Sequence, residues 1–219
     1  MSTINWLKPC LIALIVLIIG TNNVNGREFE RAILEQIQLR FGPEARQRIE
    51  TWENLISQSA DMPEMEKLQR VNDFFNQNTA FIDDSILWQK SDYWATPIEF
   101  LLKGAGDCED YSIAKYYTLL EMGVAENKMR ITYVKSLTLN QAHMVLTYYE
   151  SPQAIPFVLD NLLASIKPAS ERTDLLPVYS FNGSSLWLAK NKASGNPAGN
   201  AENLSLWQDL KQRVLDLPF

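Results

Sequence analysis

The 219-residue sequence is poor in metal-binding and disulfide-forming residues, because it contains only one histidine and two cysteines. Four ligands of the cysteine and histidine type cannot be assembled from this set, so an ordinary structural zinc site is excluded. A disulfide framework is excluded as well. Cys10 lies in an apolar N-terminal segment, which leaves Cys108 without a partner in the rest of the chain.

Basic residues are also in the minority, with 20 Lys and Arg against 26 Asp and Glu, and the formal net charge is −6. A groove for nucleic acid needs clustered basic side chains that displace counterions from phosphates, so we expect no nucleic-acid partner. A hydrophobic share of 46% with six Trp is typical of a folded globular chain. The length suits one domain with a helical extension.

Long hydrophobic runs are absent, since the apolar stretch from Leu11 to Gly20 covers only about ten residues and a transmembrane helix needs about 20. Lys8 precedes this stretch and polar residues follow it, as in a secretory signal peptide. We therefore expect residues 1–26 to be a signal peptide, with an N-terminal anchor as the less favoured alternative. Cleavage before Arg27 predicts an exported protein with no stable membrane insertion afterwards.

The periodicity of apolar residues predicts helices first and a sheet afterwards. Helical spacing runs from Glu28 to Asn76, with a break at Gly42-Pro43 and a third helix from Pro63 to Phe75. A further helix is predicted from Cys108 to Met122. Three runs rich in β-branched and aromatic residues follow, at Arg130–Val134, Ala142–Tyr149 and Ile155–Leu159. The fold class is α+β, with N-terminal helices and a helix beginning at Cys108 that packs on an antiparallel β-sheet.

Two segments do not fit this pattern. The aromatic-rich stretch from Ile86 to Pro97 either fills the core under a long loop, the favoured interpretation, or forms the wall of a substrate groove. Residues 191–202 are rich in Asn, Gly and Ala and read as a flexible linker before an amphipathic helix from Leu204 to Leu215. The predicted organisation is a main domain over 27–190, followed by a linker and C-terminal helix over 191–219.

Cys108 is the candidate nucleophile. It opens a helix, whose N-terminal dipole favours the thiolate, and an unpaired cysteine in an exported protein indicates a bond to another chain or a thiol kept for reactivity. The preceding Gly104-Ala105-Gly106 would let backbone approach a bound substrate. A lone histidine beside an apolar strand is usually structural, yet His143 opens one strand and Asp160 ends the next. Nucleophile on a helix, base on a strand and carboxylate on the next strand is the order of papain-like and transglutaminase-like folds.

We therefore predict that His143 takes the thiol proton and that Asp160 orients the imidazole, with the Cys108 N–H in the oxyanion hole. Glu150 and Asp174 are weaker candidates for the orienting carboxylate, because neither ends a strand next to the histidine strand.

Three carboxylates, from Asp107, Glu109 and Asp110, surround the thiol in sequence, and carboxylates alone would raise its pKa. Two interpretations stay equally open. Asp107 and Asp110 can form a variant of the helix capping box. Alternatively the carboxylates bind Ca²⁺, a hard cation that prefers oxygen ligands and reverses the local charge.

Four strings of the sequence resemble the bacterial transglutaminase-like cysteine proteinases: DYWATP at 92–97, GAGDCEDY at 104–111, AHMV at 142–145 and LDN at 159–161. The resemblance is strong from about Phe81 to Asp160. It implies a transglutaminase-like fold and a periplasmic thiol protease. Such a protease trims the N-terminal region of a large outer-membrane adhesin, which releases the adhesin and disperses biofilm.

The resemblance also implies the catalytic residues Cys108, His143 and Asp160, and calcium dependence with Asp107 and Glu109 as ligands. It further implies control by an inner-membrane receptor that sequesters the protease when cyclic di-GMP is high. Two other functions remain: a transglutaminase-type acyl transferase with the same three residues, and a non-catalytic binding module. The module is disfavoured because all three residues are present.

Overall fold

The structure is a computed structural model that describes residues 24–189 and 197–216. The predicted signal peptide, residues 1–26, therefore lies almost entirely outside the described residues. The first described helix begins at Val24, so the predicted cleavage point before Arg27 falls in its first turn. Within the described ranges, no helix combines the length and apolar character needed to cross a bilayer.

The elements follow the predicted order of helices and then strands. The helices are α1 (Val24–Phe41), α2 (Pro43–Ser57), α3 (Glu64–Asn78), α4 (Asp84–Leu87), α5 (Pro97–Lys103), α6 (Cys108–Glu121) and α7 (Ser205–Asp216), with short 3-10 helices η2 (Glu126–Lys128), η3 (Ala169–Glu171) and η5 (Ala201–Asn203). The strands are β1 (Ala80–Phe81), β2 (Ala105–Gly106), β3 (Met129–Ser136), β4 (Gln141–Tyr148), β5 (Phe157–Leu159), β6 (Lys167–Pro168), β7 (Leu175–Phe181), β8 (Ser185–Leu188) and β9 (Gly199–Asn200).

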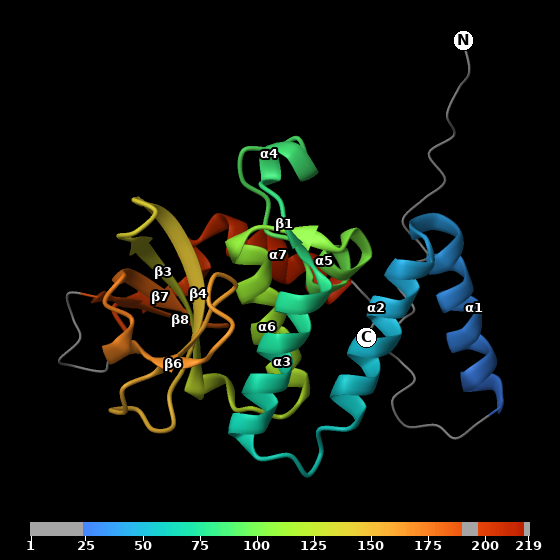
Figure 1. Ribbon diagram of the computed structural model, residues 1–219, viewed down its shortest axis with the longest axis horizontal. Coiled ribbons are helices and arrows are strands. Elements are labelled where there is room, and N and C mark those ends of the chain that lie inside the picture. Colours follow the sequence, from blue (N-terminus) through green and yellow to red (C-terminus); the bar gives the residue numbers. More distant parts are fainter. Residues whose placement is uncertain (1–23, 190–196, 217–219) are drawn as a thin grey trace.

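Strands β3 to β9 form one antiparallel sheet in the order β6-β5-β4-β3-β7-β8-β9, and β1 pairs with β2 in a separate parallel ribbon. Helices α3 and α6 lie beside the sheet, and α1 and α2 lie at the far end of the helical layer (Figure 1). Helix α6 packs against β3 and β4 on one side and against α3 and α5 on the other. The predicted α+β class, with the Cys108 helix on an antiparallel sheet, is confirmed.

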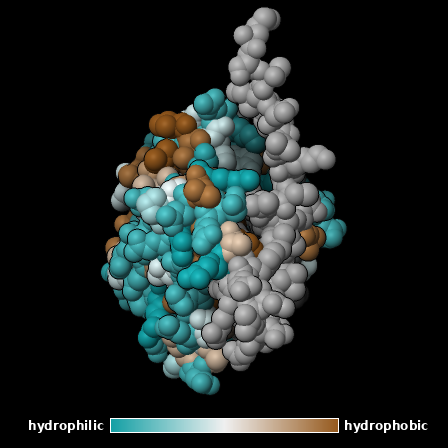
Figure 2. Space-filling view, turned by 90° about the vertical axis from the view of Figure 1, so that its right-hand side faces the viewer, coloured by the Kyte–Doolittle hydropathy of each residue, from teal (hydrophilic) through white to brown (hydrophobic). Residues whose placement is uncertain are grey.

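The predicted helices form where the pattern placed them. Gly42 has a positive φ of 91° and Pro43 opens α2, which explains the break between α1 and α2. The core between helices and sheet is built from fully buried side chains that include Leu68, Phe75, Phe100, Ile113, Leu119, Met129 and Leu146. On the face seen from the helical end, the surface that is not drawn grey is mostly hydrophilic, with one hydrophobic patch at its upper left (Figure 2).

The predicted strands correspond to β3, β4 and β5, but the sequence did not reveal β7 and β8. Strand β7 pairs with β3 in the middle of the sheet, although it contains Pro177, a residue that argues against a central strand. The register shifts between Tyr133 and Val134, where β7 skips one residue. A bulge of this kind is where a strand tolerates proline.

The C-terminal segment is more ordered than predicted. Residues 190–196 lie outside the described residues, but β9 adds to the sheet beside β8 and Ala201 is fully buried. The predicted C-terminal helix is present as α7. Its Trp207 is fully buried against the rings of Trp94, Tyr116 and Phe181. Helix α7 therefore belongs to the main core.

Because Trp207 lies in that core, Trp207→Ala should lower the free energy of unfolding by about 3–5 kcal/mol through lost burial and a new cavity. Leu215→Ala, on the same helix but with its side chain 74% exposed, should change it by no more than about 0.5 kcal/mol. Urea unfolding followed by circular dichroism measures both. Equal effects of the two variants would show that α7 does not contribute to the core.

Candidate active site

An open cleft of about 580 Å³ lies at the N-terminus of α6. The ends of β3 and β4 form one side of it, and residues 203–206 form another. Cys108 and His143 both line this cleft. The structure therefore brings the predicted nucleophile and the predicted base to one solvent-accessible space, although they are 35 positions apart in the sequence.

Cys108 is the first residue of α6 and is partly buried. Its Sγ donates a hydrogen bond to Oε2 of Glu109 at 3.1 Å. Burial raises the pKa of the thiol, and the carboxylates of Glu109 and Asp107 raise it further, whereas the backbone N–H of Met144 lowers it. The residue that follows His143 thus reaches the sulfur. The surroundings of the thiol, as they stand, favour its protonated form.

His143 and Asp160 form a buried pair. Nε2 of His143 lies 2.8 Å from Oδ1 of Asp160, and the two side chains are 3% and 0% exposed. The register explains the contact: Leu146 of β4 faces Leu159 of β5, so the residue after β5 lies diagonally across from His143 on the same face of the sheet. The hydrogen bond occupies Nε2, which leaves Nδ1 of His143 free to take a proton.

Asp160 is also held by a charge that the sequence analysis missed. Nη2 of Arg172 donates to Oδ2 of Asp160 at 2.7 Å, and the backbone N–H of Leu162 donates to Oδ1 at 3.0 Å. Burial raises the pKa of Asp160, but the hydrogen bonds from His143, Leu162 and Arg172 outweigh it and lower the pKa to about 2. Asp160 is therefore ionised throughout the physiological range.

Asp174, one of the weaker candidates for the orienting carboxylate, bonds to Arg172 through both of its oxygens and holds that guanidinium against Asp160. In sequence, Arg172 lies in a polar loop between acidic residues and looks like a solvated surface arginine. Only the return of this loop to β5 buries it, and no periodic signal marks that return.

The two glycines before Cys108 have structural roles of their own. Gly104 ends α5 with a positive φ of 67°, as a helix C-cap. A Cβ at Gly106 would collide with the Asp110 side chain and the Phe100 ring. Gly106 is therefore required by the packing of the protein itself, and the approach of a substrate to this backbone stays a prediction.

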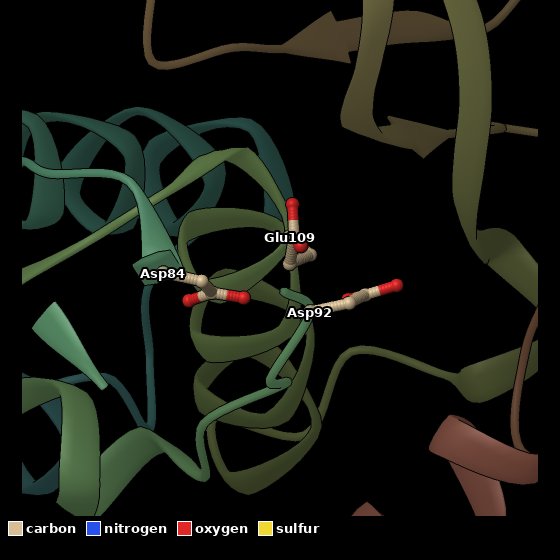
Figure 3. A group of neighbouring side chains, drawn as sticks. All are labelled: Asp84, Asp92 and Glu109. Atoms are coloured by element: carbon tan, nitrogen blue, oxygen red, sulfur yellow. The ribbon is translucent and has the colours of Figure 1, made fainter. Parts of the chain in front are cut away.

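The acidic residues near the thiol form two overlapping clusters. Oxygens of Asp84, Asp107 and Asp110 lie within 4.8 Å of one another, and so do oxygens of Asp84, Asp92 and Glu109. Figure 3 shows Asp84 and Asp92 beside the first turn of α6, which carries Glu109. The two predicted ligands, Asp107 and Glu109, thus fall in different clusters, and Asp84 belongs to both.

The geometry of the clusters fits a hard cation. Oδ1 of Asp84 and Oδ1 of Asp107 are buried, and neither has a hydrogen-bond partner among the described residues. Burial and the neighbouring Glu109 raise the pKa of Asp107 to about 9, and burial raises the pKa of Asp84 and Asp110. Crowded carboxylates with unpartnered oxygens are the donor set that Ca²⁺ prefers.

The capping interpretation holds in part. Oδ2 of Asp110 accepts from the Asp107 N–H at 3.3 Å, and Oδ1 of Asp110 accepts from the Ala95 N–H at 2.7 Å. The Asp110 carboxylate therefore fixes the start of α6, but capping does not explain why Oδ1 of Asp107 is buried without a partner.

The sequence analysis missed Asp84. Only the parallel pairing of β1 with β2, in which Phe81 lies opposite Gly106, brings the segment that contains Asp84 beside α6.

The aromatic stretch serves both roles that the sequence left open. Trp94 is 6% exposed and stacks on Phe181 at 5.7 Å between ring centroids, so it belongs to the core. It also lines the cleft, together with Tyr133 and Tyr179, whose rings stack at 5.1 Å. Part of the wall of the cleft is thus aromatic.

A thiol at a helix start in an open cleft, beside a buried histidine–aspartate pair, is the arrangement of enzymes that use a cysteine nucleophile. The sequence profile of the bacterial transglutaminase-like cysteine proteinases (BTLCP) matches residues 44–187. The chain therefore belongs to this family of cysteine peptidases.

Solved structures of Legionella pneumophila LapG are similar over most of the chain. The EGTA-treated form is 44% identical with a TM-score of 0.72 and covers 82% of this chain and 96% of its own. The calcium-bound form is 43% identical with a TM-score of 0.70 and covers 83% and 98%. The search of curated proteins found no match.

The depressed pKa of Asp160 predicts how stability changes with pH. The folded pKa of about 2 lies below the ordinary 3.8, so the unfolded chain binds this proton more readily. The ionised carboxylate therefore stabilises the fold above pH 3.8, and this contribution is lost as the pH falls through about 2. The excess stability of the wild type over Asp160→Asn should shrink by on the order of 2 kcal/mol across this window, measured by urea unfolding.

Asp209→Asn is the matched control, because this carboxylate is 63% exposed and forms an ion pair with Arg213 on its own helix. Its effect should stay within about 0.5 kcal/mol at every pH. A difference between wild type and Asp160→Asn that is constant over the window would contradict a depressed pKa.

Proposed function

We propose that the protein is a calcium-dependent cysteine endopeptidase in which Cys108 is the nucleophile, His143 the base and Asp160 the orienting carboxylate. The observation that carries the proposal is the buried 2.8 Å hydrogen bond between His143 and Asp160 at the cleft that holds Cys108. Membership of a cysteine peptidase family supports it.

The chemistry begins with the thiol proton. With Nε2 bound to Asp160, Nδ1 of His143 accepts the proton, and the resulting imidazolium is stabilised by the carboxylate. The Cys108 thiolate attacks the scissile carbonyl carbon. The backbone N–H of Cys108, at the positive end of α6, is placed to donate to the developing oxyanion. His143 then protonates the leaving amine, and water hydrolyses the thioester.

Asp84, Asp92, Asp107 and Glu109 would hold a calcium ion, whose positive charge opposes the effect of the clustered carboxylates on the thiol. Asp110 takes part less, since both of its oxygens accept backbone hydrogen bonds. Glu109 matters most for the chemistry, because it accepts the Cys108 hydrogen bond. If Glu109 bound the cation, its carboxylate would no longer accept the hydrogen bond of the thiol, and His143 could take the thiol proton. The calcium-bound form of the Legionella relative supports calcium as the cation.

The biological role that we propose follows the family resemblance. The enzyme acts in the periplasm, where it cleaves the N-terminal region of a large outer-membrane adhesin and so releases the adhesin and promotes biofilm dispersal. An inner-membrane cyclic di-GMP receptor sequesters it. The 44% identity to Legionella LapG and the N-terminal apolar segment of the sequence support this role.

Cleavage of an adhesin N-terminal fragment by the protein purified after export tests the function. Cleavage should be lost in Cys108→Ala and in His143→Ala, and lost reversibly when EGTA removes calcium. Cleavage that survives EGTA but not Cys108→Ala would refute calcium dependence and leave the thiol mechanism. Incorporation of an amine into the fragment instead of cleavage would identify an acyl transferase.

A substitution of Asp84 distinguishes a calcium site from simple helix capping, because Asp84 lies outside α6 and belongs to both acidic clusters. Asp84→Asn should weaken calcium binding on the order of tenfold or more, measured by isothermal titration calorimetry. Asp83→Asn, an exposed neighbour that belongs to neither cluster, should change the affinity by less than about threefold. Equal affinities of wild type and Asp84→Asn would exclude Asp84 as a ligand.

A further inference from the structure

Lys115 is a buried cation that the proposed chemistry does not use. It lies on α6, two turns after Cys108, and is 1% exposed. Its Nζ donates to Oδ1 of Asn72 and to Oδ1 of Asn76, both at 2.8 Å. Burial lowers its pKa to about 7, although Asp160 and Asp73 favour the charged form. A cation kept in this place without a contacting carboxylate is costly, so its contacts call for an explanation.

The lysine fixes the orientation of the two amides. An ammonium group has three donors and no acceptor, so each asparagine must turn its oxygen toward Lys115 and its NH₂ away. Asn76 Nδ2 consequently donates to the backbone carbonyl of Asp160 at 2.8 Å, and Asn72 Nδ2 donates to that of Ala164 at 2.9 Å. The two residues are one turn apart on α3 and reach the same loop at different points.

Asp160 needs this support, because it lies just beyond the sheet. Strand β5 is three residues long and ends at Leu159, and β6 pairs only with Phe157 and Val158. The ladder therefore does not hold the Asp160 carbonyl, and Asn76 supplies the donor. The side chain of Asp160 can meet His143 at hydrogen-bonding distance only if this backbone stays in place.

We propose that Asn76, oriented by Lys115, is a positioning residue that fixes the backbone of Asp160 and thereby the imidazole of His143. The network runs from the helix that carries the nucleophile, through α3, to the loop that carries the carboxylate. The inference rests on the proposed catalytic residues.

The asparagine pair provides a matched experiment. Asn76→Leu and Asn72→Leu make the same change in side-chain volume and add no charge. Each variant leaves Lys115 with one amide partner. They differ in which carbonyl loses its donor, that of Asp160 or that of Ala164. The readout is the pH dependence of Cys108 alkylation by iodoacetamide in calcium-containing buffer, which reports the thiolate and requires no adhesin. His143→Ala is measured alongside, and thermal unfolding checks that each variant is folded.

Asn76→Leu should slow alkylation at neutral pH about tenfold and move its midpoint to higher pH, because a displaced Asp160 stabilises the imidazolium less well. Asn72→Leu should lose similar thermal stability but stay within about twofold of wild type. If the two variants behave alike, or if the Asn76→Leu midpoint does not move, the network is only structural. If His143→Ala alkylates like wild type, the proposed catalytic residues fail as well. Asn76→Ala and Asn72→Ala, which leave room for water, give the same comparison should a leucine variant not fold.

Discussion

The buried carboxylate of Asp160 is the group on which the rest of the site depends. A carboxylate removed from water is destabilising unless hydrogen bonds and opposite charge replace its hydration. Here His143, Leu162 and Arg172 surround its two oxygens, and Asn76 holds its backbone. Each of these partners comes from a different segment of the chain. The orientation of the imidazole is therefore a property of the folded domain, and no local motif could produce it.

The opposite constraint acts on the thiol, which lies between two regions of unlike charge. On the sheet side is the Asp160 network, in which the hydrogen bonds of His143 and Arg172 keep the carboxylate ionised. On the helix side, burial and the carboxylates of Glu109 and Asp107 raise the pKa of Cys108, and Glu109 accepts the hydrogen bond of the thiol. The protonated thiol is therefore favoured as long as Glu109 accepts its hydrogen bond. A calcium ion bound by Glu109, as proposed, would oppose this effect.

Much of this arrangement could be predicted from sequence, because the informative signals were local. A glycine-rich break before Cys108, a single histidine and an aspartate at the end of an apolar run indicated three residues that the structure brings to one site, and the helix and strands beside them. Asp84 and Arg172 could not be found in this way. Asp84 depends on the pairing of β1 with β2, and Arg172 depends on a loop that folds back over β5. Both look like ordinary surface charges until tertiary contacts bury them.

The central strand β7 was missed for a related reason. Pro177 and the short alternation around it weaken the strand signal, and the bulge that accommodates the proline exists only once β3 lies beside it. Local patterns therefore predicted the helix and the strands that hold the proposed catalytic residues, but they did not predict β7, which joins β3 to β8.

The C-terminal segment shows how far the family resemblance reaches. The family profile ends at residue 187, yet residues 203–206 line the cleft. Arg213 of α7 donates to Glu99 at 2.6 Å and to the Trp94 carbonyl at 2.5 Å, and its guanidinium lies 4.7 Å from the Tyr93 ring centre. Helix α7 thus contacts Trp94, which lines the cleft. The three proposed catalytic residues therefore lie within the family profile, whereas part of the cleft lining, residues 203–206, lies beyond it.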